Sequence, residues 1–100
     1  MEEQNRISEI SEKLKPIFMN NPVYKAVLFG SYAKGTFNEN SDIDIIIDTR
    51  GELRGLNFYS VLDEMTEILQ KPVELIEISE IKKGAGFFDN VNSGVVLYER

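Results

Sequence analysis

Two aspartates separated by one residue, Asp42 and Asp44, are the side chains in this sequence best suited to chemistry. They open an apolar run, Ile45-Ile46-Ile47, which is typical of a β-strand that is covered on both faces. Because strand side chains alternate between the two faces, both carboxylates point the same way. Neighbouring negative charges repel one another, and Mg²⁺ would relieve that repulsion because hard cations take carboxylate oxygens as ligands. The simpler alternative is a strand that starts in solvent, with both aspartates hydrated.

A glycine-serine pair, Gly30-Ser31, stands ten residues before the first of these aspartates and follows the apolar run Val27-Leu28-Phe29. We expect a short helix to begin directly after the pair, and the N-terminus of a helix offers unpaired N–H groups to a phosphate. Gly30 would let the backbone approach the phosphate, the Ser31 hydroxyl could donate a hydrogen bond, and Lys34 could reach the same anion. The alternative is a turn glycine, an N-cap serine and a solvated lysine.

The hydrophobic pattern predicts the elements that must position these residues. Apolar residues recur at helical spacing in two stretches, and short apolar runs separate them. The pattern predicts helices over about 3–19, 32–34 and 56–70, and strands over about 23–29, 42–48, 72–78 and 95–98. The second long helix can make a right-handed crossover, so the third strand is expected to lie parallel beside the second. We therefore predict a single α+β domain over residues 1–100, with a small mixed β-sheet of about four strands flanked by helices.

Composition removes several classes of function. The net charge is −6 and the longest basic feature is Lys82-Lys83, so the basic surface typical of a nucleic-acid-binding protein is absent. The chain contains no cysteine and no histidine, which excludes disulfides, thiolate zinc sites and histidine-based catalytic triads. Carboxylates remain the main candidate bases at neutral pH, which agrees with a reaction of phosphates that uses Mg²⁺.

The length of the chain limits what it can hold by itself. One hundred residues form one domain with a modest core and leave no room for a second domain that would hold a substrate. An acceptor must therefore be a partner protein or be held with a partner's help. Because the start Met1-Glu2-Glu3 is acidic and no apolar run approaches about 18 residues, we expect neither a signal peptide nor a membrane span. We expect a cytoplasmic protein with no membrane partner.

The spacing of Gly30-Ser31, ten residues and Asp42-x-Asp44 resembles the signature of the DNA polymerase beta-like nucleotidyltransferase superfamily. The fuller runs, Leu28 to Gly35 and Ser41 to Ile45, resemble its minimal members. Those are small antitoxin nucleotidyltransferases that are paired with HEPN-domain toxins in bacteria and archaea. The resemblance covers most of the chain and implies the nucleotidyltransferase fold.

The resemblance also implies roles for individual residues. Asp42, Asp44 and a third carboxylate, Glu74, would be the catalytic residues and the ligands of two Mg²⁺ ions. The minimal family usually has aspartate where this chain has Glu74, whose carboxylate reaches one methylene further. The residues assigned to nucleotide binding are Gly30, Ser31, Lys34 and Ser41.

The activity that the resemblance implies is transfer of AMP from ATP to a tyrosine hydroxyl of a HEPN-domain toxin, which neutralises the toxin. The protein would then form a hetero-oligomer with the toxin and make no direct contact with nucleic acid. Two alternatives stay open. The protein could be a weak or inactive enzyme that neutralises the toxin by binding and occlusion, or it could transfer a nucleotide to a small molecule such as an antibiotic.

Overall fold

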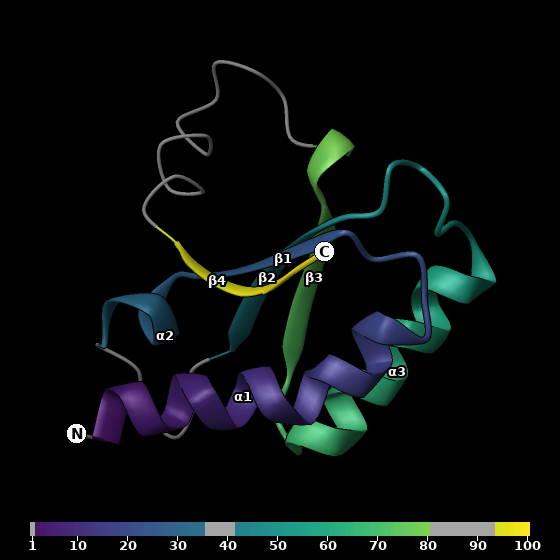
Figure 1. The fold of residues 1–100 in the computed structure, drawn as a ribbon. Helices are drawn as coiled ribbons and strands as arrows, with labels where there is room; N and C mark the ends of the chain where they lie inside the picture. Colours follow the sequence, from purple (N-terminus) through teal and green to yellow (C-terminus); the bar gives the residue numbers. More distant parts are fainter. Residues whose placement is uncertain (1, 36–41, 81–93) are drawn as a thin grey trace.

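The computed structural model describes residues 2–35, 42–80 and 94–100, and in these ranges the predicted helices and strands follow in the predicted order (Figure 1). The elements are α1 (Glu2–Met19), β1 (Lys25–Phe29), α2 (Ser31–Lys34), β2 (Ile43–Asp48), α3 (Leu56–Leu69), β3 (Val73–Glu77), the 3-10 turn η1 (Ile78–Glu80) and β4 (Val95–Glu99). Each boundary lies within two residues of its expected position, and only η1 was not predicted. None of the helices in these ranges is both long and apolar enough to cross a membrane.

The four strands form one mixed sheet in the order β3-β2-β1-β4. β1 is antiparallel to both β2 and β4, whereas β2 and β3 run parallel. The crossover between the parallel strands contains α3, which lies with α1 along one face of the sheet (Figure 1). The structure therefore confirms the predicted α+β fold and the parallel placement of the third strand beside the second.

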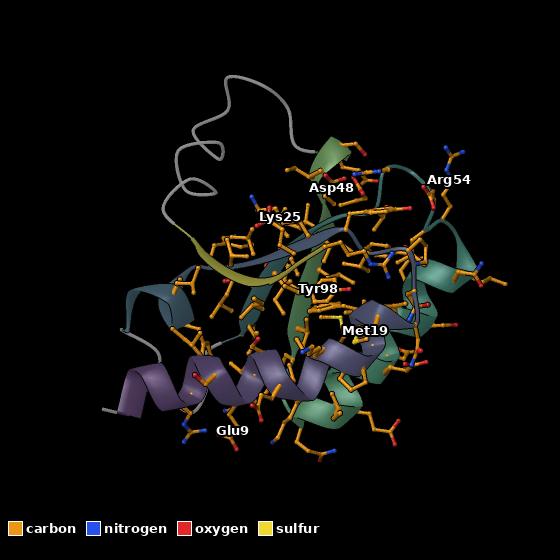
Figure 2. The ribbon with its side chains drawn as sticks, viewed as in Figure 1. Glu9, Met19, Lys25, Asp48, Arg54 and Tyr98 are labelled. Atoms are coloured by element: carbon orange, nitrogen blue, oxygen red, sulfur yellow. The ribbon has the colours of Figure 1, made fainter. Side chains whose placement is uncertain are left out.

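Alternation along β2 lets one strand serve both the core and a polar site. Ile43, Ile45 and Ile47 are buried and belong to the core cluster, which also contains residues of the long helices. Figure 2 shows side chains in the layer between the sheet and these helices. Asp44 and Ile46 consequently lie on the opposite face of the strand. Because Ile46 is also buried, β2 is apolar on both faces, as its run of isoleucines predicted. The helices contribute to the core cluster through residues that include Leu14, Phe18, Val61 and Met65.

One buried carboxylate ties the ends of the two parallel strands together. Glu77 Oε2 accepts hydrogen bonds from Thr49 N at 2.8 Å and Thr49 Oγ1 at 2.6 Å, and Glu77 Oε1 accepts one from Ser79 N at 2.6 Å. Burial would raise the pKa of Glu77, but these hydrogen bonds outweigh burial and hold the pKa below its ordinary value. By strand alternation Glu77 lies on the face opposite Glu74, so this carboxylate belongs to the fold and is separate from the candidate active site.

Candidate active site

Asp44 and Glu74 face one another across the parallel strand pair. The register of β2 and β3 pairs these two residues directly, and alternation places both on the face away from α1 and α3. Asp44 is half-buried and Glu74 is exposed, so the pair lies where the sheet meets solvent. The predicted parallel placement of the third strand beside the second thus brings Glu74 opposite Asp44.

The surroundings of Asp44 raise the pKa of its carboxyl. It is raised from an ordinary value of 3.8 to about 6, first by burial, then by a hydrogen bond shared with Glu74 and by the negative charges of Glu74 and Asp42. Near pH 6 the Asp44 carboxyl therefore holds a proton for part of the time. A bound cation would compete with that proton for the same oxygens.

Gly30 joins the glycine-serine pair to the carboxylates. Its φ is +76°, a conformation that side-chain-bearing residues rarely adopt. A Cβ built on Gly30 would overlap Asp44 Oδ2 and would lie 3.3 Å from Asp44 Cγ. The Gly30 backbone therefore packs directly against the Asp44 carboxylate, and α2 begins at the next residue.

The other predicted site residues have different outcomes. Asp42 directly precedes β2, is exposed, and is close enough for its charge to raise the pKa of Asp44. Ser31 and Lys34 form the two ends of the short helix α2. Ser41 lies outside the described residues, so its role in nucleotide binding stays a prediction.

The donor set fits Mg²⁺ by its chemistry. Asp42, Asp44 and Glu74 offer only carboxylate oxygens, which hard cations prefer. The pKa of Asp44 is raised first by burial and then by Glu74 and Asp42, and a bound cation would offset this cost of the charged form. Within residues 2–35, 42–80 and 94–100, no three acidic side chains are already gathered closely enough to hold one ion. The assignment of these three residues as metal ligands therefore stays a prediction, which requires Asp42 or Glu74 to move toward Asp44.

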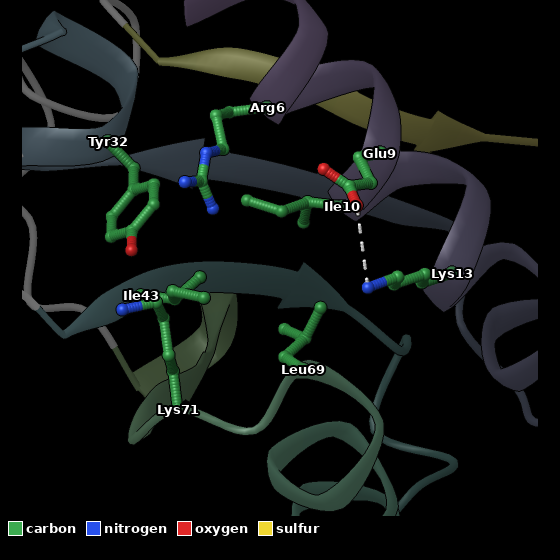
Figure 3. A pocket seen from close by; sticks show the side chains of 8 residues that line it. All are labelled: Arg6, Glu9, Ile10, Lys13, Tyr32, Ile43, Leu69 and Lys71. Carbon is green, nitrogen blue, oxygen red and sulfur yellow. Dashed lines mark ion pairs between the residues drawn. The ribbon is translucent and has the colours of Figure 1, made fainter. Parts of the chain in front are cut away.

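Sequence reasoning missed a pocket on the helix-covered side of the sheet. Arg6, Lys13, Tyr32 and Lys71 are among the residues that line it (Figure 3). They come from α1, α2 and the turn before β3, so no spacing in the sequence could have grouped them. The one signal available in the sequence was Tyr32, an aromatic residue directly after the glycine-serine pair. The structure buries it almost fully.

Solved structures of other proteins share this fold. A chain of a crystal structure described as "the toxin-antitoxin with AMP-PNP" aligns with a TM-score of 0.76 and 24% identity, over 90% of this chain and 73% of that chain. A chain of "the toxin-antitoxin MntA-HepT" aligns with a TM-score of 0.68 and 19% identity, over 91% of this chain and 71% of that one. At such identities the likeness establishes the fold.

Relatives by sequence are closer. Two proteins of Methanocaldococcus jannaschii carry the name "Putative protein adenylyltransferase". MJ0604 is 36% identical, over 98% of this chain and 100% of the relative. MJ0435 is 35% identical, over 75% of this chain and 81% of the relative. Residues 12–100 match the family Polymerase beta, Nucleotidyltransferase. With the paired carboxylates and the glycine against them, this match shows that the chain belongs to the polymerase beta-like nucleotidyltransferase family.

Proposed function

We propose that this protein is a Mg²⁺-dependent enzyme that transfers AMP from ATP to a tyrosine hydroxyl of a HEPN-domain toxin and so acts as its antitoxin. The observation that carries the proposal is the convergence of three features at one end of β2. Asp44 and Glu74 lie directly opposite one another there, and the Gly30 backbone lies against the Asp44 carboxylate. A nucleotidyltransferase needs carboxylates for metal beside a backbone that phosphates can approach.

The relatives support ATP as the donor and a toxin as the acceptor. MJ0604 and MJ0435 carry the name "Putative protein adenylyltransferase", and a toxin-antitoxin structure with a similar chain contains AMP-PNP. Another related complex carries glutamates in place of two aspartates that stand one residue apart, which is the spacing of Asp42 and Asp44. A third carries alanine in place of a tyrosine.

The residues of this chain would contribute mainly position and charge. Asp42 and Asp44 would hold two Mg²⁺ ions, and contact with the Gly30 backbone keeps the Asp44 carboxylate in place. Gly30 and Ser31 would contact the β- and γ-phosphates, with Lys34 and Ser41 completing the nucleotide site. Bound Mg²⁺ supplies charge neutralisation on the phosphates and a lower pKa for the attacking hydroxyl.

Glu74 would be either the third metal ligand or the base that takes the tyrosine proton. The register of β2 and β3 keeps its carboxylate opposite Asp44, where the tyrosine oxygen must arrive. In the transfer, the tyrosine oxygen bonds to the α-phosphorus, the bond from that phosphorus to the bridging oxygen breaks, and pyrophosphate leaves. The proton of the hydroxyl passes to the base or to water.

The test is to incubate the full chain with its toxin partner, Mg²⁺ and ATP labelled in the α-phosphate. We expect label on a toxin tyrosine, and none when Asp44→Ala replaces the wild-type protein. An exposed aspartate on α3 gives the matched control, since Asp63→Ala should label the toxin normally. If the toxin stays unlabelled by the wild type, or is labelled equally by Asp44→Ala, the enzymatic proposal is wrong.

A second candidate function is neutralisation of the toxin by occlusion. It is favoured by Glu74 at a position where the family usually has aspartate, and by the lack of a ready three-carboxylate cluster among the described residues. The discriminating variant is Asp42→Ala combined with Asp44→Ala. If occlusion is the mechanism, this double variant protects cells from the toxin as well as the wild type does. Under the enzymatic proposal, protection is lost although the complex still forms.

A further inference from the structure

The pocket between α1, α2 and the start of β2 gathers positive charge in a chain whose net charge is −6 (Figure 3). Arg6, Lys13 and Lys71 line it, and Glu9 is the one carboxylate among its described lining residues. Basic side chains from two separate parts of the chain thus converge on one space. Such a concentration attracts an anion.

Among the described residues, Glu9 forms an ion pair with one of the three basic side chains, Lys13. Glu9 Oε1 lies 3.6 Å from Lys13 Nζ, and both side chains are about half exposed, at 58% and 47%. An exposed pair at that distance is weak and exchanges readily. Arg6 makes no ion pair with any carboxylate whose side chain the structure describes. Its guanidinium points toward the space between Tyr32 and Ile10 (Figure 3).

The size of the pocket limits the ligand. The cavity measures about 50 Å³. One water molecule needs roughly 10–15 Å³ of such volume, so the cavity has room for about four waters. A tetrahedral phosphate group matches that room, whereas a nucleoside does not. Arginine and lysine side chains are the usual partners of a phosphate oxygen.

The pocket lies close to the candidate active site but on the other face of the sheet. Tyr32 follows Ser31 directly, and Ile43 follows Asp42 directly. Ile43 points into the helix-covered core, whereas Asp44 points to the opposite face. An anion in this pocket would therefore sit near the end of β2 without occupying the place of the metal ligands.

We propose that this pocket is a second phosphate site, which binds one phosphate group through Arg6, Lys71 and Lys13. The phosphate could be inorganic phosphate, one end of pyrophosphate or the terminal phosphate of a nucleotide. Because pyrophosphate is the leaving group of AMP transfer, a role in holding that product rests on the proposed function. Binding of the phosphate itself does not.

The test is an NMR titration of the full chain, ¹⁵N-labelled, in EDTA so that no divalent metal is present. Inorganic phosphate, pyrophosphate and ATP are added in separate arms, which identify the source of the phosphate group. We expect at least one of them to shift the Arg6 side-chain N–H and the backbone amides of Ile10, Tyr32 and Ile43. The same shifts should persist in an Asp42→Asn, Asp44→Asn variant, because the pocket is separate from the carboxylates.

Charge-matched variants decide whether the pocket itself binds. Arg6→Gln should weaken binding at least tenfold, and Lys71→Gln should weaken it similarly. Lys15→Gln removes one positive charge from the same helix outside the pocket lining, and should change affinity less than twofold. If Arg6→Gln and Lys15→Gln weaken binding equally, the phosphate is attracted only by the overall positive charge of the helix, and the proposal is wrong. Loss of the shifts in the double aspartate variant would also overturn it, because the phosphate would then belong to the active site.

The outcome is independent of whether the enzyme works. If AMP transfer fails but phosphate still binds at Arg6, the proposed function is wrong and the second site stands. If AMP transfer occurs and none of the three phosphates shifts the pocket amides, the second site is wrong and the proposed function stands.

Discussion

The contact between Gly30 and Asp44 links the two chemical features of this chain at the level of single atoms. The Gly30 backbone leaves no room for a Cβ beside Asp44 Oδ2, so backbone and carboxylate are in direct contact. A phosphate that approaches Gly30 must therefore also approach Asp44. Glycine is needed here both for this space and for its positive φ of +76°.

Adding one methyl group at Gly30 tests the need for space beside Asp44 and the need for a positive φ together. Comparison with a second glycine separates the two. Gly30→Ala is expected to lower AMP transfer at least about 100-fold, because small displacements of reacting groups carry large costs. It should lower the free energy of unfolding by about 1–2 kcal/mol for the positive φ, and by about 1–3 kcal/mol more for the collision with Asp44.

The matched control is Gly55→Ala, since Gly55 also has a positive φ, of 59°, but nothing lies within 4 Å of the place that a Cβ would take there. This variant should lose only the backbone contribution and should keep its transfer activity. Urea unfolding and the labelling assay measure both quantities. Equal stability and activity in the two alanine variants would show that the contact with Asp44 has no role.

The raised pKa of Asp44 predicts that the metal-free protein is destabilised by its own site. Asp44 has a pKa of about 6 in the folded protein against 3.8 ordinarily, so the folded state binds protons more tightly. Stability therefore falls as pH rises from about 4 to 6, and the full cost is present above that range. Asp44→Asn removes the charge, and in EDTA at pH 7.5 it should raise the free energy of unfolding by roughly 1–2 kcal/mol, discounted for solvent screening.

The gain from Asp44→Asn should vanish near pH 4, where the wild-type carboxyl is protonated in the folded state. Urea unfolding at pH 4, 6 and 7.5 gives the comparison. If Asp44→Asn is no more stable than the wild type at pH 7.5, holding the Asp44 charge in the folded protein is not a significant cost.

At the residue scale, the sequence was most informative where chemistry demands a fixed type and spacing. Asp42, Asp44 and Gly30 could be named because the i, i+2 period of a strand and the special freedom of glycine act locally. Glu74 needed the crossover prediction, and its pairing with Asp44 bore that out. The Arg6–Lys71 pocket could not be foreseen, since its members meet only through packing of α1 against the sheet and α3.

At the level of elements, the position of Glu74 depends on the register between two parallel strands. A slip of one residue would turn Glu74 to the helix-covered face and remove it from the site. Glu77 counters such a slip, because its carboxylate binds Thr49 just after β2 and Ser79 just after β3. These contacts join the C-terminal ends of β2 and β3 and so hold the two strands in register.

Glu77→Gln should therefore destabilise the fold. Loss of the charged acceptor is expected to lower the free energy of unfolding by about 2–3 kcal/mol at pH 7. Because the folded pKa of Glu77 is lowered, its contribution is present above the ordinary pKa of 4.5 and is lost as pH falls through the folded value. The difference between variant and wild type should thus shrink below pH 4.5.

Glu99→Gln serves as the control for this prediction. Glu99 forms an exposed ion pair with Lys25, with 3.7 Å between Oε2 and Nζ. Its replacement should change stability by less than about 0.5 kcal/mol at any pH. Urea unfolding from pH 3 to 7 compares the variants. If Glu77→Gln is as stable as Glu99→Gln, the Glu77 carboxylate does not stabilise the fold.

The elements themselves were predictable because their hydrophobic periods are long and regular. Ile43, Ile45 and Ile47 alternate with Asp44 and Ile46, which indicated a strand that is buried on both faces. The turn η1 was missed because its three residues, Ile78–Glu80, have no period of their own. What fixes it is a side-chain contact, from Ser79 N to Glu77 Oε1, that exists only after folding.

At the scale of the whole molecule, metal binding should measurably change the stability of the fold because the domain is small. A domain of 100 residues is only marginally stable, and the cost of holding the Asp44 charge in the folded protein reduces that margin. A ligand that binds only the folded state stabilises it by mass action. The unfolding temperature should therefore report on the metal site even without a toxin or a nucleotide.

Mg²⁺ at ten times its dissociation constant should stabilise the protein by about 1.4 kcal/mol. For a domain of this length, that corresponds to a rise in Tm of roughly 5–10 °C over the same protein in EDTA. The rise should be larger at pH 8 than at pH 5, because the proton held by Asp44 competes with the cation below about pH 6. Asp44→Asn should abolish the rise, whereas Asp63→Asn, an exposed aspartate on α3, should retain it. A Tm that responds to Mg²⁺ equally in both variants would mean that the cation binds elsewhere on this acidic surface, and the carboxylates on β2 and β3 would then have to act without it.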